Sequence, residues 1–96
     1  MKFVVRPAAA ADLRRAYLWY EAEREGLGED LLREVRQTID RVATTPEAYA
    51  VISRDTRRCL VHRFPYGIFF RVVDEVVVIV ACYHLSRRPA SWKRRR

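Results

Sequence analysis

Arginines are concentrated in the second half of this chain, and they are its clearest means of binding an anion. Six of them lie on the strands expected there or on the segment that follows: Arg57, Arg58, Arg63, Arg71, Arg87 and Arg88. A guanidinium group stays charged and forms paired hydrogen bonds with carboxylates and phosphates. These residues therefore predict a binding surface for an acidic protein segment or a nucleic acid.

Two aromatic residues accompany these arginines. His84 lies at the end of the last expected strand. Histidine changes charge near neutral pH, so His84 could act as a general base or contact a phosphate. The alternative, which we favour, is a structural hydrogen bond to the backbone of the next segment. Trp92 could stack on a nucleobase, but we expect it to fold back over the sheet as an apolar anchor.

The net charge of +7 is unevenly distributed. Residues 51–96 hold 11 basic and 3 acidic side chains, whereas residues 1–50 hold 8 basic and 9 acidic ones. A chain of 96 residues, half of them hydrophobic, is long enough for one modest core. We therefore expect a single domain over residues 1–96, with 85–96 as a basic C-terminal segment. The charge of the second half favours an anionic partner.

The composition also excludes several classes of protein. The longest apolar run, Val76–Tyr83, is eight residues long, far shorter than the roughly 20 residues of a membrane helix. We therefore expect no association with a membrane. Cys59 and Cys82 are expected to be reduced thiols in the core of a cytoplasmic protein, without a disulfide or a metal. No cofactor is expected.

The elements that must position these residues begin with a strand and two helices. Lys2–Arg6 is short and rich in β-branched residues, which predicts a strand. Helix-forming residues and apolar spacing predict helices over residues 8–25 and 29–44. Gly26 and Gly28 interrupt them. Because the connection is so short, the two helices should pack as an antiparallel hairpin.

From residue 58 onward, the apolar pattern alternates, as in β-strands. Strands are expected over Arg58–Phe64, Gly67–Val73 and Val76–Tyr83, joined by tight turns as an antiparallel meander. The predicted fold class is therefore α+β: the N-terminal strand and the three-stranded meander form one sheet, and the helix hairpin packs on one face. Because the last strand is apolar on both sides, the C-terminal segment or a partner must cover the other face.

Two motifs in the second half carry a resemblance to known proteins. The first is Phe-Pro-Tyr-Gly-Ile-Phe-Phe-Arg at residues 64–71. The second runs from the last strand through His84 to Arg-Arg-Pro at residues 87–89 and Trp92. With Ala9, Asp12 and Leu13 at the start of the first helix, these motifs resemble the RelE/ParE toxin superfamily of bacterial type II toxin–antitoxin systems. The resemblance spans essentially the whole chain.

The resemblance implies one of two activities. RelE-like members cut mRNA on the ribosome without a metal, whereas ParE-like members poison DNA gyrase. Gly67 and Ser86 stand where RelE-like enzymes place arginines, and Trp92 stands where they place a tyrosine. Their lysine cluster is also missing, because Lys2 and Lys93 are the only lysines of this chain. The resemblance is therefore closer to the ParE branch.

We accordingly predict a toxin that inhibits growth by binding DNA gyrase. The resemblance also implies a cognate antitoxin, whose acidic C-terminal segment would cover the basic half of the toxin. The alternative is a ribosome-dependent, metal-independent endoribonuclease acting on mRNA. Its catalytic residues would be His84, Arg71, Arg87 and Arg88.

Overall fold

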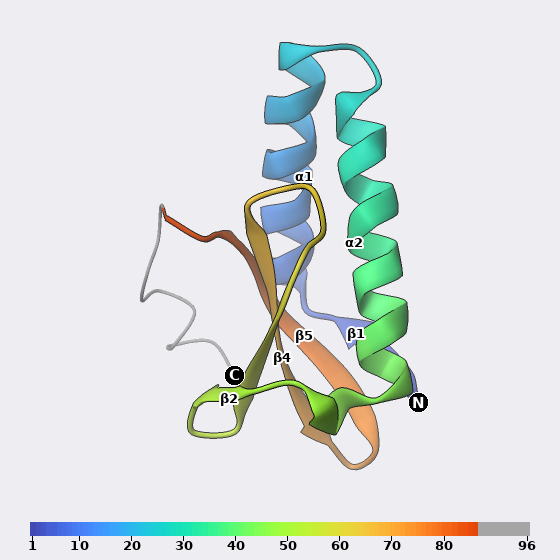
Figure 1. Cartoon of the computed structure of the whole chain (residues 1–96), viewed down its shortest axis with the longest axis vertical. Helices are drawn as coiled ribbons and strands as arrows, with labels where there is room; N and C mark the ends of the chain where they lie inside the picture. Colours follow the sequence, from blue (N-terminus) through green and yellow to red (C-terminus); the bar gives the residue numbers. More distant parts are fainter. Residues whose placement is uncertain (87–96) are drawn as a thin grey trace.

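Two helices lie against one face of a five-stranded sheet in the computed structural model, which describes residues 1–86 (Figure 1). This is the expected α+β fold. The helices are α1 (Pro7–Glu23) and α2 (Leu27–Thr44), and a short 3-10 helix, η1 (Pro46–Ala48), follows them. The strands are β1 (Lys2–Val5), β2 (Val51–Ser53), β3 (Thr56–Leu60), β4 (Tyr66–Val73) and β5 (Val76–His84).

One carboxylate holds the turn between the two helices. Gly26, which precedes α2, has a φ of 88°, a left-handed conformation that suits glycine. The carboxylate oxygens of Glu21 accept hydrogen bonds from the backbone N–H groups of Gly26 and Gly28, at 2.9 Å each. The first N–H groups of a helix have no partner inside it. Glu21 of α1 therefore caps α2 and fixes the geometry of the hairpin.

The helices approach each other closely at Gly28. A Cβ atom at this position would lie 2.7 Å from Tyr17 Cδ1 and 2.8 Å from the backbone oxygen of Tyr17. A side chain at this position would therefore push the two helices apart, so only glycine fits at the observed spacing.

The sheet has the strand order β1-β5-β4-β3-β2. The expected antiparallel meander is confirmed as β3, β4 and β5, and β1 joins it in parallel beside β5, with Lys2 opposite Val76. Two details of the prediction were wrong. The sheet has a fifth strand, β2, and β3 ends at Leu60 rather than Phe64.

A tight loop explains the early end of β3. The backbone N–H of Val61 donates to the oxygen of Tyr66 at 2.8 Å, which closes the chain between β3 and β4. Within this loop Arg63 has a φ of 75°, which a strand does not allow. His62 therefore lies exposed in the loop.

A β-bulge in β5 sets which side chains face the helices. The pairing of β4 with β5 shifts between Phe69, which lies opposite Ala81, and Phe70, which lies opposite Ile79, so Val80 is an extra residue. Such a residue interrupts the alternation of side chains. Val80 and Ala81 consequently both belong to the cluster on the far face of the sheet, and Cys82 returns to the core under the helices.

Both faces of the central strands are apolar and buried, as expected. The face under the helices carries Ile68, Phe70, Val77 and Ile79, among others. The opposite face carries Phe69, Val78, Val80, Ala81 and Tyr83. We predicted that the C-terminal segment or a partner covers this second face. Residues 87–96 lie outside the described residues, so the prediction stays open.

Candidate functional site

Arg57 is used to hold a neighbouring loop. Its Nη1 donates to the backbone oxygen of Tyr49 at 2.6 Å and more weakly to that of Glu47 at 3.4 Å. These carbonyls belong to the segment at η1, between α2 and β2. Arg57 therefore fastens that segment to β3 through its Nη1.

Two more of the predicted binding arginines form ion pairs. Arg71 makes a bidentate pair with Asp55, at 3.1 and 3.0 Å, which ties β4 to the turn before β3, and its side chain is only 18% exposed. Arg63 donates to Asp30 at 3.2 Å and lies over the ring of Phe64. It joins the β3–β4 loop to α2. Arg71 and Arg63 therefore both bind their own chain, and their contact with a partner stays a prediction.

Arg58 is different. It is exposed on β3, and its stem packs beside Gly67, where a Cβ atom would lie 3.2 Å from Arg58 Cδ. Because Cys59 faces the helices, its neighbour Arg58 faces the other way. Of the four predicted arginines that the structure describes, Arg58 is the one that forms no hydrogen bond or ion pair with another residue between 1 and 86.

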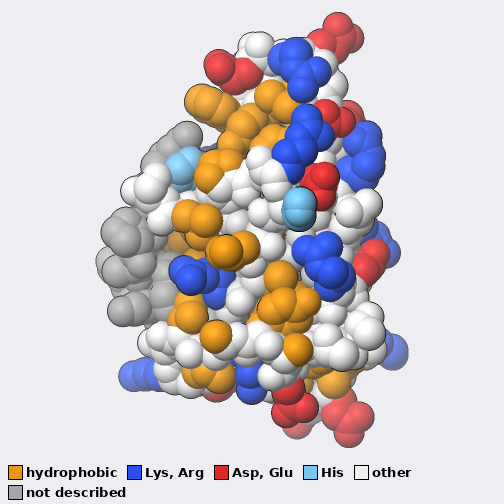
Figure 2. Space-filling view, in the orientation of Figure 1, with side chains coloured by type: hydrophobic (Ala, Val, Ile, Leu, Met, Phe, Trp, Pro, Cys, Tyr) orange, Lys and Arg blue, Asp and Glu red, His pale blue; other side chains and the backbone are white. Residues whose placement is uncertain are grey.

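The predicted arginines do not form one patch. In the view of Figure 2, Lys and Arg side chains are scattered among acidic and apolar ones. Of the four described arginines, Arg57 lies at η1 and Arg63 lies in the β3–β4 loop. Arg58 and Arg71 both lie on the far face of the sheet, on the neighbouring strands β3 and β4. The remaining predicted residues, Arg87, Arg88 and Trp92, lie outside the part of the chain that the structure describes.

His84 has the structural hydrogen bond that we favoured. Its Nδ1 accepts a hydrogen bond from the backbone N–H of Ser86 at 3.2 Å, and the Ser86 hydroxyl lies 3.1 Å from the same atom. Because a backbone N–H can only donate, Nδ1 is the acceptor, and in the neutral ring the hydrogen is on Nε2. The ring meets that of Tyr66 edge to face, with centroids 5.3 Å apart.

The predicted nuclease residues His84 and Arg71 are not brought together. Arg71 lies opposite Val78 on the far face of the sheet, whereas His84 lines a cleft beside α1. Along β5, Val78 and His84 are six residues apart, which is roughly 20 Å. A phosphate that touches one of these side chains is out of reach of the other.

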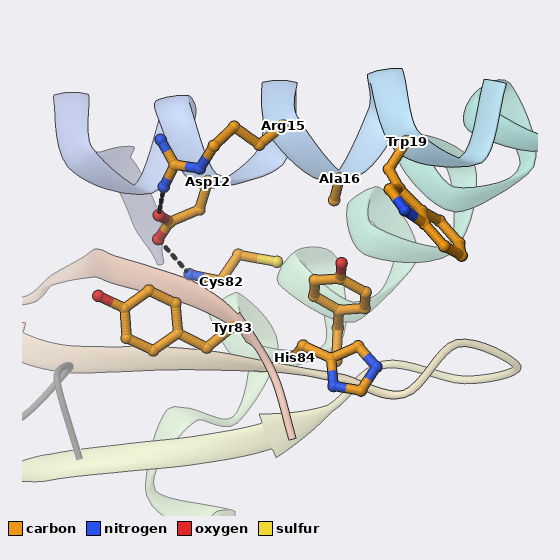
Figure 3. Close-up of a pocket in the computed structure, with 8 residues that line it drawn as sticks. Asp12, Arg15, Ala16, Trp19, Cys82, Tyr83 and His84 are labelled. Carbon is orange, nitrogen blue, oxygen red and sulfur yellow. Dashed lines mark hydrogen bonds and ion pairs between the residues drawn. The ribbon is translucent and has the colours of Figure 1, made fainter. Parts of the chain in front are cut away.

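The structure brings together a different set of residues, in a cleft between α1 and the end of β5 (Figure 3). The cleft has a volume of about 210 Å³. Its residues come from α1, β4 and β5: Asp12, Arg15, Ala16, Trp19, Tyr66, Cys82, Tyr83 and His84. Of these, only His84 is among the binding residues predicted from the sequence.

Asp12 forms one end of the cleft and completes the edge of the sheet. Pairing of β1 with β5 ends at Ile79, although β5 continues to His84. Beyond this point the backbone N–H of Cys82 donates to Asp12 Oδ2 at 3.0 Å. The other oxygen, Oδ1, accepts from Arg15 at 2.6 Å. The Asp12 side chain is 2% exposed, so a buried carboxylate takes the place of a neighbouring strand.

The polar groups of the cleft suit binding better than covalent chemistry. Both oxygens of Asp12 are engaged, and Nδ1 of His84 is engaged with Ser86. Burial, and secondly the negative charge of Asp12, raise the pKa of the Cys82 thiol far above its usual value. A thiol that keeps its proton is a poor nucleophile.

The raised pKa of Cys82 predicts a loss of stability in alkaline solution. In the unfolded chain the thiol ionises above about pH 8.5, whereas the folded protein holds the proton. The free energy of unfolding should therefore fall as the pH rises beyond this value, by at most about 1.4 kcal/mol per pH unit for this group. Urea unfolding between about pH 8 and pH 10 measures the slope, and the Cys82→Ala variant should show a shallower one. Equal slopes would contradict this assignment.

Between residues 1 and 86, neither helix is long and apolar enough to cross a membrane. In the same range, no three His, Cys, Asp or Glu side chains gather where they could hold a metal ion.

Comparisons with known proteins agree on one kind of fold. A family model described as the ParE toxin of the type II toxin–antitoxin system parDE matches residues 3–89. A search of curated proteins finds no match. A chain of the chromosomal ParDE system from P. aeruginosa is 18% identical, with a TM-score of 0.78, and the match covers 88% of this chain and 95% of that one. A chain of the intact E. coli RelBE toxin–antitoxin complex is 16% identical, with a TM-score of 0.67 and coverage of 90% and 98%.

Proposed function

Because the chain belongs to the ParE toxin family of type II toxin–antitoxin systems, we propose that it inhibits bacterial growth by binding DNA gyrase. The observation that carries this proposal is the match of the ParE model over nearly all of the chain. Gyrase acts on DNA in the cytoplasm, so we place the toxin there as well.

The positions of the predicted nuclease residues support binding over RNA cleavage. A metal-independent nuclease needs a base, an acid and cations around one phosphate. Of the predicted set, His84 and Arg71 lie on opposite faces of the sheet, and the other two members lie outside the described residues. Similarity in fold to both ParDE and RelBE chains does not by itself distinguish the two activities.

The proposed inhibitor is a cognate antitoxin with an acidic C-terminal segment. The charge of residues 51–96 supports this partner, because 11 basic side chains there face only 3 acidic ones. Arg58 is one of the proposed contacts. It is exposed, and it forms no ion pair with another residue of the described range, 1–86. Arg87, Arg88 and Trp92 remain proposed contacts.

A supercoiling assay tests the target directly. Expression of the toxin without its antitoxin should arrest growth, and the purified toxin should block ATP-dependent supercoiling of relaxed plasmid by gyrase. The control is the same toxin after incubation with purified antitoxin, which should restore supercoiling. Normal supercoiling, together with cleavage of ribosome-bound mRNA, would contradict the proposal.

The nuclease alternative has its own test. Primer extension on translated mRNA should show no toxin-dependent cleavage if the toxin acts on gyrase. If cleavage occurs and is lost in both His84→Ala and Arg87→Ala, the endoribonuclease is the correct function.

A further inference from the structure

We propose that the cleft between α1 and the end of β5 accepts one aromatic side chain of the antitoxin and so anchors it to the toxin. The inference rests on the proposed function for the identity of its partner. It adds a place of contact that is separate from Arg58, and it names the kind of side chain that binds there.

The size of the cleft fits a single side chain. Pockets that bind whole small molecules usually have volumes of about 300–1,000 Å³, and this cleft has about 210 Å³. Figure 3 shows Trp19 pointing from α1 toward the sheet, with the short side chain of Ala16 next to it and His84 on the opposite wall. The small residue leaves room between rings on the two walls.

The walls of the cleft favour an aromatic ring. Trp19 stands on one side, and the edge-to-face pair of Tyr66 and His84 stands on the other. Aromatic rings gain free energy from such arrangements beyond that of burial alone. Trp19 is 46% exposed, so a partner ring would bury a large aromatic surface that this chain leaves in contact with water.

The charges of the cleft favour a protein side chain over a nucleotide. Arg15 would be the natural ligand of a phosphate, but Asp12 neutralises it at 2.6 Å. The pair carries no net charge, so the residues between 1 and 86 that line the cleft supply no surplus positive charge to hold an anionic backbone. An uncharged aromatic side chain needs no positive charge in order to bind.

The surroundings give a partner chain access. The cleft lies at the sheet edge where β5 continues beyond the end of β1. Aromatic anchors that enter a pocket commonly carry most of the free energy of an interface, while contacts around them contribute little.

Binding measurements on the full chain test the proposal. The probe is the antitoxin encoded by the reading frame next to the toxin gene, and its Kd is measured by calorimetry. Trp19→Ala should raise the Kd at least about 30-fold, as expected for the loss of an aromatic anchor. The matched control is Leu18→Ala, which removes a more exposed apolar side chain from the next position of the same helix and should change the Kd less than about threefold.

A second measurement leaves Trp19 in place. In a Trp92→Phe chain, Trp19 is the only tryptophan. Addition of the antitoxin should shift its fluorescence to shorter wavelength and protect it from quenching by acrylamide. Unchanged quenching in a complex that forms would overturn the proposal.

The outcomes separate the cleft from the proposed function. If the wild-type toxin does not bind the antitoxin, the proposed function fails and the cleft proposal fails with it. If the wild type binds and Trp19→Ala binds equally well, or Leu18→Ala weakens binding as much as Trp19→Ala, only the cleft proposal is overturned. The cleft proposal alone is also overturned if Trp19→Ala abolishes binding to labelled oligo(dT) and leaves antitoxin binding intact.

Discussion

Substitution of Asp12 by alanine should lower the free energy of unfolding by about 2–3 kcal/mol. The carboxylate is 2% exposed and accepts the backbone N–H of Cys82 at 3.0 Å, at a place where no strand can replace it. Alanine would leave that N–H buried without an acceptor, and a buried, unpaired donor costs the full free energy of its dehydration. The loss corresponds to a melting temperature lower by about 10–20 °C in a domain of this size.

Thermal and urea unfolding followed by circular dichroism measure this effect. Asp12→Asn is the informative second variant, because its amide oxygen can still accept from Cys82 while the ion pair with Arg15 is lost. It should retain most of the stability. Asp40→Ala is the matched control, since Asp40 also pairs with an arginine on a helix but is exposed. An Asp12→Ala loss as small as the control's would contradict the role given to Asp12.

Substitution of Gly28 by alanine should destabilise the protein by about 1–3 kcal/mol. In an unconstrained helix the same change would stabilise by up to about 1 kcal/mol, because alanine forms helices better than glycine. Here the new Cβ would lie 2.8 Å from the backbone oxygen of Tyr17 and 2.9 Å from Glu21 Oε1. The helices would have to separate, and Glu21 would be displaced from the N–H groups that it caps.

The matched control is Gly26→Ala, two residues earlier. Nothing lies within 4 Å of a Cβ atom at Gly26, so its cost comes only from the left-handed backbone, about 1 kcal/mol. Urea unfolding of both variants distinguishes crowding from backbone conformation. If Gly28→Ala is as stable as the wild type, the close approach of the helices is not required.

Most of the fold could be predicted because its signals are local. Pro7, Gly26 and Pro46 mark the ends of the helices, and the alternating residues of β4 and β5 mark the meander. Strand β2 was missed because it is only three residues long. The end of β3 was misplaced because the alternation of side chains continues into a loop in which Arg63 leaves the extended conformation.

The site was harder to predict because its contacts join distant residues. Arginines on alternating strands look alike in a sequence, yet Arg71 pairs with Asp55 and Arg63 with Asp30, on other elements. The cleft needs Asp12 and Cys82, which are 70 positions apart. Asp12 belongs to a motif in the sequence, but only the structure shows that its carboxylate accepts a hydrogen bond from the sheet.

The parallel pairing of β1 with β5 also constrains when the protein can fold. The ribosome makes β1 first, and its partner strand is complete only when His84 has been made. Until then, the nascent chain carries a helix hairpin whose apolar side has no finished sheet to cover it. Such long-range pairing is slow and raises the contact order. The cleft at the end of β5, with all the residues that line it, therefore comes into existence only after nearly the whole described chain has been synthesised.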